Sequence, residues 1–317
     1  MSSSNFNLDT PIALLVFNRP ETTAKVFAAI RAARPKQLFL VADGPRLDHA
    51  DDNALCVEVR HIVEQIDWPC EVLKNYSDKN LGCSVRPATG ITWVFEQVNE
   101  AIILEDDCLP EPSFFRYCQE LLQMYRDDER IAVIRGDNWP ATAGGQEASY
   151  RFSHYPSTWG WATWRRVWIN YDIKLSAWSG EPRIPWLKSI LGTYTMAWYW
   201  QRIFDRTIRL TDCSWWDYQF VFSCWLRGQL SIVPMDNLVS NIGGGFSATH
   251  TTVKDDPRLG RQLTPMTFPL HHPETVRRDL NNEISGDITL ARCEWWLRKN
   301  SARFMGKVMA DDYGRTV

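Results

Sequence analysis

The sequence predicts an α/β fold in which helices cover both faces of a mostly parallel central sheet. Short apolar runs alternate with segments whose apolar residues recur at helical spacing, and turn residues separate the two kinds. The same order repeats several times through the first half of the chain. Such alternation is typical of a parallel sheet with crossover helices.

The predicted strands are short apolar runs that stop at turn or polar residues. In chain order they span residues 11–18, 37–42, 70–75, 101–104 and 131–135. The predicted helices span residues 22–33, 53–66, 113–125 and a stretch from Leu81 to Val98 that is helical beyond Pro87. Ligands bind beyond the carboxyl ends of strands in such sheets, so residues that follow the strands are the first candidates for a site.

The pattern changes at Asn138, where glycine pairs and Trp-rich segments replace the alternation. We expect residues 1–137 to form the α/β half of one domain. Residues 138–255 would complete the same domain with loops and helices and form an aromatic-rich region. Residues 256–317 would form a C-terminal helical extension.

Composition limits the class of protein. A chain of 317 residues that is 44% hydrophobic can bury a full core. Its net charge of -3 provides no basic field for nucleic acid. No apolar run is long enough to span a bilayer, so we expect a cytoplasmic protein. The eight cysteines form no CxxC pair, which favours reduced thiols over a zinc or redox site.

An acidic triplet is the most informative feature of the chain. The apolar run Ala101–Leu104 stops at Glu105, Asp106 and Asp107. Adjacent carboxylates repel one another and are costly to desolvate unless a cation lies among them. Oxygen ligands suit Mg²⁺ or Mn²⁺. The alternative is a solvated turn.

Two further candidates follow strands. Arg19 comes after the first strand, where its guanidinium either binds a diphosphate or lies at the surface. Asp43 comes after the second strand, where its carboxylate either accepts a hydrogen bond from a uracil imide or belongs to a simple turn.

Asp217 lies in the sequence Trp-Trp-Asp-Tyr, and this bulky setting predicts a raised pKa that suits a general base. The alternative is that Asp217 is the N-cap of a helix that begins at Tyr218. His250 lies in a glycine-rich segment, GGGFSATHTT, where it either contacts a metal or phosphate or is structural.

The chain has 16 tryptophans, eleven of them between Trp159 and Trp225. Indole faces pack against sugar rings as well as they fill a core. Trp159, Trp161 and Trp216 are the candidates for contact with a sugar or acceptor, with Arg165 and Arg166 at the edge of that site, and core packing is the alternative. Residues 291–310 place basic side chains beside aromatic ones, which fits either a helix at a membrane surface or one that packs on the body of the protein.

Residues 102–117, IILEDDCLPEPSFFRY, resemble a family motif. The family is the inverting GT-A glycosyltransferases of the N-acetylglucosaminyltransferase I type, together with related bacterial sugar-nucleotide transferases. The segments GWATWRRVW and NLVSNIGGGFSATHT look like those of the bacterial members, and the resemblance runs from about residue 11 to residue 252. It implies a GT-A, Rossmann-like fold. The membrane anchor and the acceptor-binding parts of the animal enzyme are not recognisable.

The resemblance implies an activity and roles for single residues. The reaction would be transfer of a sugar from a nucleotide-sugar, a UDP-sugar such as UDP-GlcNAc, to a hydroxyl of a glycan or lipid-linked glycan in bacterial polysaccharide biosynthesis. Mn²⁺ or Mg²⁺ would be held by Asp107, with His250 a further candidate, and Asp217 would be the catalytic base. Nucleotide contacts would come from Arg19, Asp43, Glu105 and Asp106. Apart from the resemblance, the composition of residues 291–310 would allow contact with the inner face of the membrane.

Other functions remain open on the sequence. A noncatalytic glycan-binding protein would explain the tryptophans but has no need of three acids at a strand end. A sugar-nucleotide nucleotidyltransferase usually carries a Gly-rich loop with a lysine after the first strand, where this chain has Asn18-Arg19-Pro20. A metal-dependent phosphohydrolase usually needs more Asp and His ligands.

Overall fold

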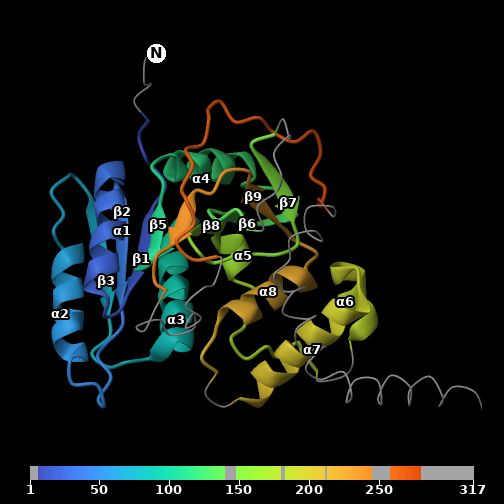
Figure 1. The fold of residues 1–317 in the computed structure, drawn as a ribbon, viewed down its shortest axis with the longest axis horizontal. Helices are drawn as coiled ribbons and strands as arrows, with labels where there is room; N and C mark the ends of the chain where they lie inside the picture. Colours follow the sequence, from blue (N-terminus) through green and yellow to red (C-terminus); the bar gives the residue numbers. More distant parts are fainter. Residues whose placement is uncertain (1–5, 140–147, 180–182, 211–212, 245–257, 280–317) are drawn as a thin grey trace, which may run out of the picture.

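The fold is built on an eight-stranded mixed sheet with helices on both faces (Figure 1). The computed structural model describes residues 6–139, 148–179, 183–210, 213–244 and 258–279. The strand order is β3-β2-β1-β4-β8-β6-β9-β7. This arrangement confirms the predicted α/β class and its mostly parallel sheet.

The strands of the large sheet are β1 (Ile12–Val16), β2 (Gln37–Ala42), β3 (Glu71–Tyr76), β4 (Glu100–Glu105), β6 (Ile131–Arg135), β7 (Tyr150–Ser153), β8 (Trp161–Trp164) and β9 (Leu230–Pro234). A small antiparallel pair consists of β5 (Cys108–Pro110) and β10 (Val239–Asn241). β1 pairs in parallel with β2 and β4, and β8 runs antiparallel between β4 and β6. The five predicted strands are confirmed, each to within two residues at either end.

The helices are α1 (Pro20–Ala33), α2 (Asp52–Val63), α3 (Gly82–Gln97), α4 (Ser113–Met124), α5 (Arg165–Trp168), α6 (Ile184–Leu191), α7 (Tyr194–Arg209) and α8 (Asp217–Leu226). α3 begins before Pro87, so the predicted start of this helix was wrong. Proline inside a helix removes one backbone hydrogen bond. The Arg86 guanidinium supports the early turns by donating to the carbonyl oxygens of Ala42, at 3.2 Å, and of Asn75.

The second half of the chain contributes strands, which corrects the prediction of loops and helices only. β7, β8 and β9 join the same sheet as β1 to β4. They are only four or five residues long, and β8 consists of Trp-Ala-Thr-Trp, a sequence that also fits a sugar-contacting segment. Residues 258–279 contain no helix. Residues 280–317, the rest of the predicted helical extension, lie outside the described part of the chain.

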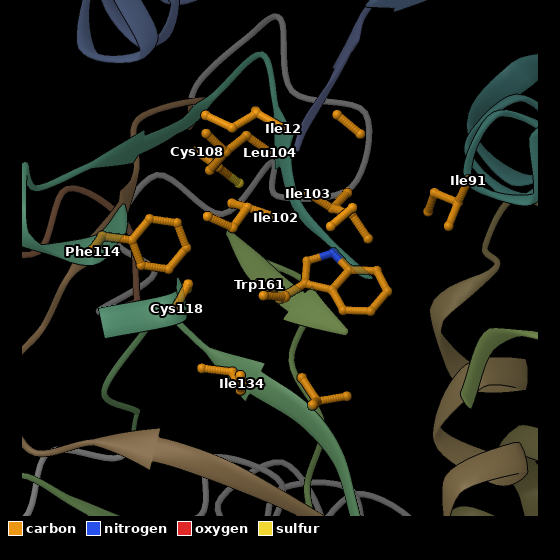
Figure 2. Close-up of a cluster of buried hydrophobic side chains, with 14 of the residues drawn as sticks. Ile12, Ile91, Ile102, Ile103, Leu104, Cys108, Phe114, Cys118, Ile134 and Trp161 are labelled. Carbon is orange, nitrogen blue, oxygen red and sulfur yellow. The ribbon is translucent and has the colours of Figure 1, made fainter. Parts of the chain in front are cut away.

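The core fills both faces of the sheet. Ile102 and Leu104 of β4 point toward Phe114 and Cys118 of α4, as Figure 2 shows. Ile103 points the opposite way, toward Trp161 and Ile91, as the alternation of side chains along a strand requires. These side chains are at most 1% exposed.

A second apolar cluster joins α6, α7 and α8. Trp178, Trp200 and Trp225 pack there with Phe204 and Phe222. Three of the 16 tryptophans of the chain therefore fill this second core.

No helix in the described part of the chain has the length and apolar character needed to cross a bilayer. The seven described cysteines are free thiols, as predicted. The predicted membrane contact of residues 291–310 concerns residues that the structure does not describe, and it stays a prediction.

Replacing Gly136, the residue just after β6, by alanine is predicted to destabilise the fold. A Cβ at this position would overlap Val239 Cγ2 and lie 2.7 Å from Phe114 Cε2 and 2.8 Å from the Gly160 carbonyl oxygen. Overpacking of this kind costs about 1–3 kcal/mol. We expect Gly136→Ala to lower the urea midpoint, measured by tryptophan fluorescence, and the double variant with Val239→Ala to recover part of the loss. An unchanged midpoint in Gly136→Ala would contradict this packing.

Candidate active site

The acidic triplet lies where β4 ends at the carboxyl edge of the sheet. Glu105 is the last residue of β4, and its neighbour in β1 is Leu15. Asp106 and Asp107 follow in the turn to β5 and are only 6% and 8% exposed. The alternative of a solvated turn is therefore wrong. Burial, the largest cause, and repulsion from neighbouring carboxylates raise the pKa of Glu105.

Arg19 supplies the positive charge that the triplet requires. Its Nη1 lies 2.7 Å from Asp107 Oδ2 and 3.5 Å from Asp106 Oδ1. Asp106 also accepts a hydrogen bond of 3.0 Å from the Phe17 backbone nitrogen. Burial lowers the pKa of Arg19, but the carboxylates outweigh it and leave that pKa raised. The turn after β1 thus brings a cation to acids that lie almost 90 residues later in the chain.

The end of β10 and the residues that follow it fix the position of Asp107. The backbone nitrogen of Ile242 donates to the Asp107 carbonyl oxygen at 2.8 Å. Asn241 Nδ2 donates to Asp107 Oδ1 at 3.4 Å, and the Gly243 nitrogen donates to Asn241 Oδ1 at 3.0 Å. Sequence analysis missed Asn241 and Gly243, although the glycine run in this segment was the signal. His250 lies outside the described residues, and its metal contact stays a prediction.

Asp43 joins two loops at the same edge. Its Oδ1 accepts from the Gly44 and Leu81 nitrogens, both at 2.9 Å. Its Oδ2 accepts from the Gly82 nitrogen at 3.0 Å and from Asn80 Nδ2 at 3.1 Å. Burial raises the pKa of Asp43, and these donors oppose the rise. The carboxylate therefore does more than close a simple turn, and its contact with uracil stays a prediction.

Asp52 is a second buried acid that sequence analysis missed. It is 2% exposed and accepts from Arg46 Nε at 2.6 Å and from Asn18 Nδ2 at 2.7 Å. The Arg46 side chain, the main cause, holds the pKa of Asp52 well below its usual range. The loops after β1 and β2 are thereby tied together.

Two adjoining cavities occupy this edge of the sheet. We call the smaller one, of about 320 Å³, the carboxylate cavity because Asp43, Asp106 and Asp107 line it together with Arg19. The larger, of about 520 Å³, is lined mainly by aromatic and charged side chains, and we call it the aromatic cavity. Both are lined by Cys83, Pro87, Glu105 and Trp159. The predicted Arg19, Asp43 and acidic residues are therefore brought together in one cavity.

Asp217 lines the aromatic cavity. It is the first residue of α8, and Trp216 occupies the N-cap position, so the alternative that Asp217 caps a helix beginning at Tyr218 is wrong. Glu105 lines the same cavity, and the charge of Asp217 is the smallest of the causes that raise the pKa of Glu105. The predicted base thus faces the cavity next to the acidic triplet.

The three candidate tryptophans have different surroundings. Trp159 lines both cavities, and Trp216 lines the aromatic cavity while only 5% exposed. Trp161 is fully buried, because β8 lies between β4 and β6, and it packs against Trp168 and Phe220. The prediction that Trp161 contacts a sugar is therefore wrong, and core packing is its role.

The arginines that follow β8 are also structural. Arg165 Nε donates to the Val98 carbonyl oxygen at 3.2 Å. Arg166 donates to three backbone carbonyl oxygens and stacks over Trp164. Neither residue lines the aromatic cavity. The prediction that Arg165 and Arg166 lie at the edge of a sugar site is therefore wrong.

Gly243 offers a direct test of the acidic site. A Cβ at Gly243 would overlap Asp107 Oδ2 and lie 2.7 Å from Asp107 Cγ, so the carboxylate would have to move. The adjacent Gly244 is a matched control, because its closest contact would be the mobile end of the Leu259 side chain. We expect Gly243→Ala to weaken binding of UDP with Mn²⁺ by at least about tenfold and Gly244→Ala to leave it near wild type, measured by calorimetry. Equal UDP affinities in the two variants would show that the position of Asp107 does not affect UDP binding.

Comparison with known proteins adds little to this geometry. No protein-family model matches the chain, and no curated protein matches its sequence. The structure is similar to a crystal structure of S. aureus TarS, residues 1–349, with a TM-score of 0.34 and 9% identity. The match covers 52% of this chain and 49% of that chain, so this chain spans about half of the TarS structure. A similarity at this level carries no argument about activity.

Proposed function

We propose that the protein is a glycosyltransferase that moves a sugar from a nucleotide-sugar, a UDP-sugar, to a hydroxyl of a glycan or glycolipid with inversion. The observation that carries this proposal is the pairing of the two cavities. The carboxylate cavity holds Arg19 and the acids, the aromatic cavity holds Asp217, and Glu105 lines both. A donor and an acceptor can therefore meet at a shared wall.

The carboxylate cavity suits a nucleoside diphosphate. It lies beyond the carboxyl ends of β1, β2 and β4, where α/β sheets bind ligands. Arg19 is the cation in its wall, and a guanidinium matches two phosphate oxygens at once. Arg46 and Arg86 line the same cavity, but Asp52 pairs with Arg46, and Arg86 donates to the Ala42 carbonyl oxygen. We assign the diphosphate to Arg19.

The acids fit a divalent cation that arrives with the diphosphate. Among the described residues, no group of three or more His, Cys, Asp or Glu side chains forms a ready-made metal site. Mg²⁺ or Mn²⁺ needs only one or two carboxylates when substrate phosphates and water complete its ligands. Asp107 Oδ2, now paired with Arg19, is the oxygen we assign to the cation. When bound, the cation would supply positive charge to the departing diphosphate.

The position of Asp217 supports a role as the base that acts on the acceptor. In a single displacement the attacking hydroxyl approaches from the side opposite the leaving group and gives its proton to one base. Asp217 lies in the aromatic cavity and the diphosphate-binding groups lie in the other, so attack across their shared wall inverts the anomeric centre. Trp159, which lines both cavities, can pack against the transferred sugar.

A noncatalytic glycan-binding protein accounts for less of the structure. It would use the aromatic cavity, but it gives no reason for buried acids and a guanidinium in the adjoining one. A measurement of UDP binding therefore distinguishes a glycosyltransferase, which should bind UDP, from a noncatalytic glycan-binding protein, which should not.

Asp217→Asn tests the base. The substitution removes the proton acceptor and changes little volume, so we expect transfer to fall at least about 100-fold while UDP affinity is unchanged. Initial rates of UDP release in the presence of acceptor, together with calorimetry, measure both quantities. Asp205→Asn, on α7 and outside the cavity lining, is the control. Rates within about tenfold of wild type would remove Asp217 from the mechanism.

Asp107 and Arg19 should respond differently to metal. We expect Asp107→Ala to abolish the gain in UDP affinity that Mn²⁺ provides, because the cation loses its carboxylate. Arg19→Gln should instead weaken UDP binding both with Mn²⁺ and with a chelator, because the guanidinium contacts the phosphates directly. Calorimetry in the two conditions distinguishes the variants, and an unaltered Mn²⁺ effect in Asp107→Ala would refute the metal assignment.

A further inference from the structure

The helix α7 belongs both to the aromatic cavity and to the surface of the protein. Its buried side, which includes Trp200 and Phe204, packs against α6 and α8. Tyr199 and Ile203 line the aromatic cavity. The exposed residues of α7 and its C-cap are Tyr194, Arg202, Arg206, Ile208, Arg209 and Leu210.

One row of side chains leads from the cavity to the exposed end of α7. Residues at positions i, i+4, i+7 and i+11 of a helix share one side. In α7 and its C-cap these are Tyr199, Ile203, Arg206 and Leu210. The Arg206 guanidinium lies 5.2 Å from the ring centroid of Trp215, which also lines the aromatic cavity. Arg206 is therefore at the edge of the cavity, and Leu210 lies one helical turn beyond it.

The segment that contains α6 and α7 is basic. Residues 183–210 include Arg183, Lys188, Arg202, Arg206 and Arg209, and their single acid is Asp205. Glu181 and Asp212 flank the segment and lie outside the described residues. With these two included, residues 181–212 still carry more basic than acidic side chains. The segment thus differs in sign from the whole chain, whose net charge is -3.

Two of the α7 arginines can bind a partner. Arg202 already interacts within the protein, and we assign no ligand to it. Arg206 and Arg209 form no ion pair within 4.0 Å with another described residue. Asp205, four residues before Arg209, instead accepts a hydrogen bond of 2.9 Å from Trp178 Nε1. The stacking of Arg206 on Trp215 leaves its charge in place, because an indole carries none.

Apolar and aromatic side chains accompany these arginines. Leu210 is 39% exposed, and Tyr194, at the other end of α7, is 58% exposed. Lys188 Nζ lies 4.3 Å from the centroid of the Tyr194 ring, so that end also combines a cation with an aromatic group. Helices at membrane surfaces have this mixture, because aromatic rings and arginine stems enter the headgroup layer while the charged groups reach the phosphates.

We propose that the exposed side of α7 binds an anionic membrane surface, with Arg206 and Arg209 at the lipid phosphates and Tyr194 and Leu210 at the headgroup boundary. This surface is separate from the contact predicted for residues 291–310. The membrane would present the headgroup of a lipid-linked acceptor to the aromatic cavity, at the edge where Arg206 lies. The binding itself does not require the proposed glycosyltransferase function, whereas its use for an acceptor does.

Co-sedimentation of the full chain with lipid vesicles tests the charged part of the surface. The probes are vesicles of phosphatidylcholine alone and vesicles that also contain phosphatidylglycerol. We expect the wild type to bind the anionic vesicles at least about tenfold more tightly than the neutral ones, and to lose this preference at high salt. The double variant Arg206→Gln, Arg209→Gln should bind the anionic vesicles at least about tenfold more weakly than the wild type.

The end of α1 supplies a matched control. The double variant Arg31→Gln, Arg34→Gln removes the same charge from exposed positions at another helix C-terminus, far from α7 in Figure 1, and should bind vesicles like the wild type. Leu210→Ser keeps every charge. It should bind anionic vesicles at least about threefold more weakly, because apolar area no longer enters the headgroup layer, and should bind inorganic polyphosphate as the wild type does.

Three results would overturn the membrane assignment. Equal binding of the two kinds of vesicle by the wild type is the first. Full vesicle binding in the Arg206→Gln, Arg209→Gln variant is the second, because another part of the chain would then carry it. Full vesicle binding in Leu210→Ser is the third, since the site would then serve soluble polyanions.

Calorimetry with UDP on the same proteins keeps this inference separate from the proposed function. Arg206 and Arg209 line neither cavity, so their double variant should bind UDP like the wild type, which also shows that it is folded. A wild type that binds anionic vesicles but not UDP would lose the proposed function and keep the membrane surface. A wild type that binds UDP but no vesicles would keep the function and lose the surface.

Discussion

The charge balance at the end of β4 is the constraint on which the site depends. Asp106 and Asp107 are buried beside Glu105, and Arg19 pairs with both aspartates and offsets part of their charge. Carboxylates in such a position are tolerated only when a positive group stays close. The turn after β1 supplies the guanidinium, and Asn241 at the end of β10 holds Asp107.

One edge of the sheet carries both the acidic site and the aromatic cavity beside it. Because β1, β2, β4 and β6 run in the same direction, their carboxyl ends meet along one edge. Acids and Arg19 occupy one part of the edge, and Arg135 occupies another, beyond β8. α8 brings Asp217 to the cavity between them. A bound diphosphate and an acceptor would therefore be held on a rigid support.

The sequence alone predicts those features whose residues are close together in the chain. The strands from β1 to β6 that belong to the large sheet follow from apolar runs, and the acidic triplet follows from its position after one of them. It was insufficient where a residue acts across the fold. Asn241 contacts an acid 134 residues away, and no spacing indicates this. Trp161 was misjudged because an indole that fills a core has the same sequence signal as one that stacks on a sugar.

A crystal structure of the protein with UDP and Mn²⁺ would show whether Asp107 and Arg19 bind the donor. We expect the diphosphate in the carboxylate cavity, with the cation on Asp107 and with Arg19 turned from that carboxylate to the phosphates. Nucleotide bound elsewhere, or an Arg19 and Asp107 pair that stays intact beside a metal-free diphosphate, would contradict this expectation.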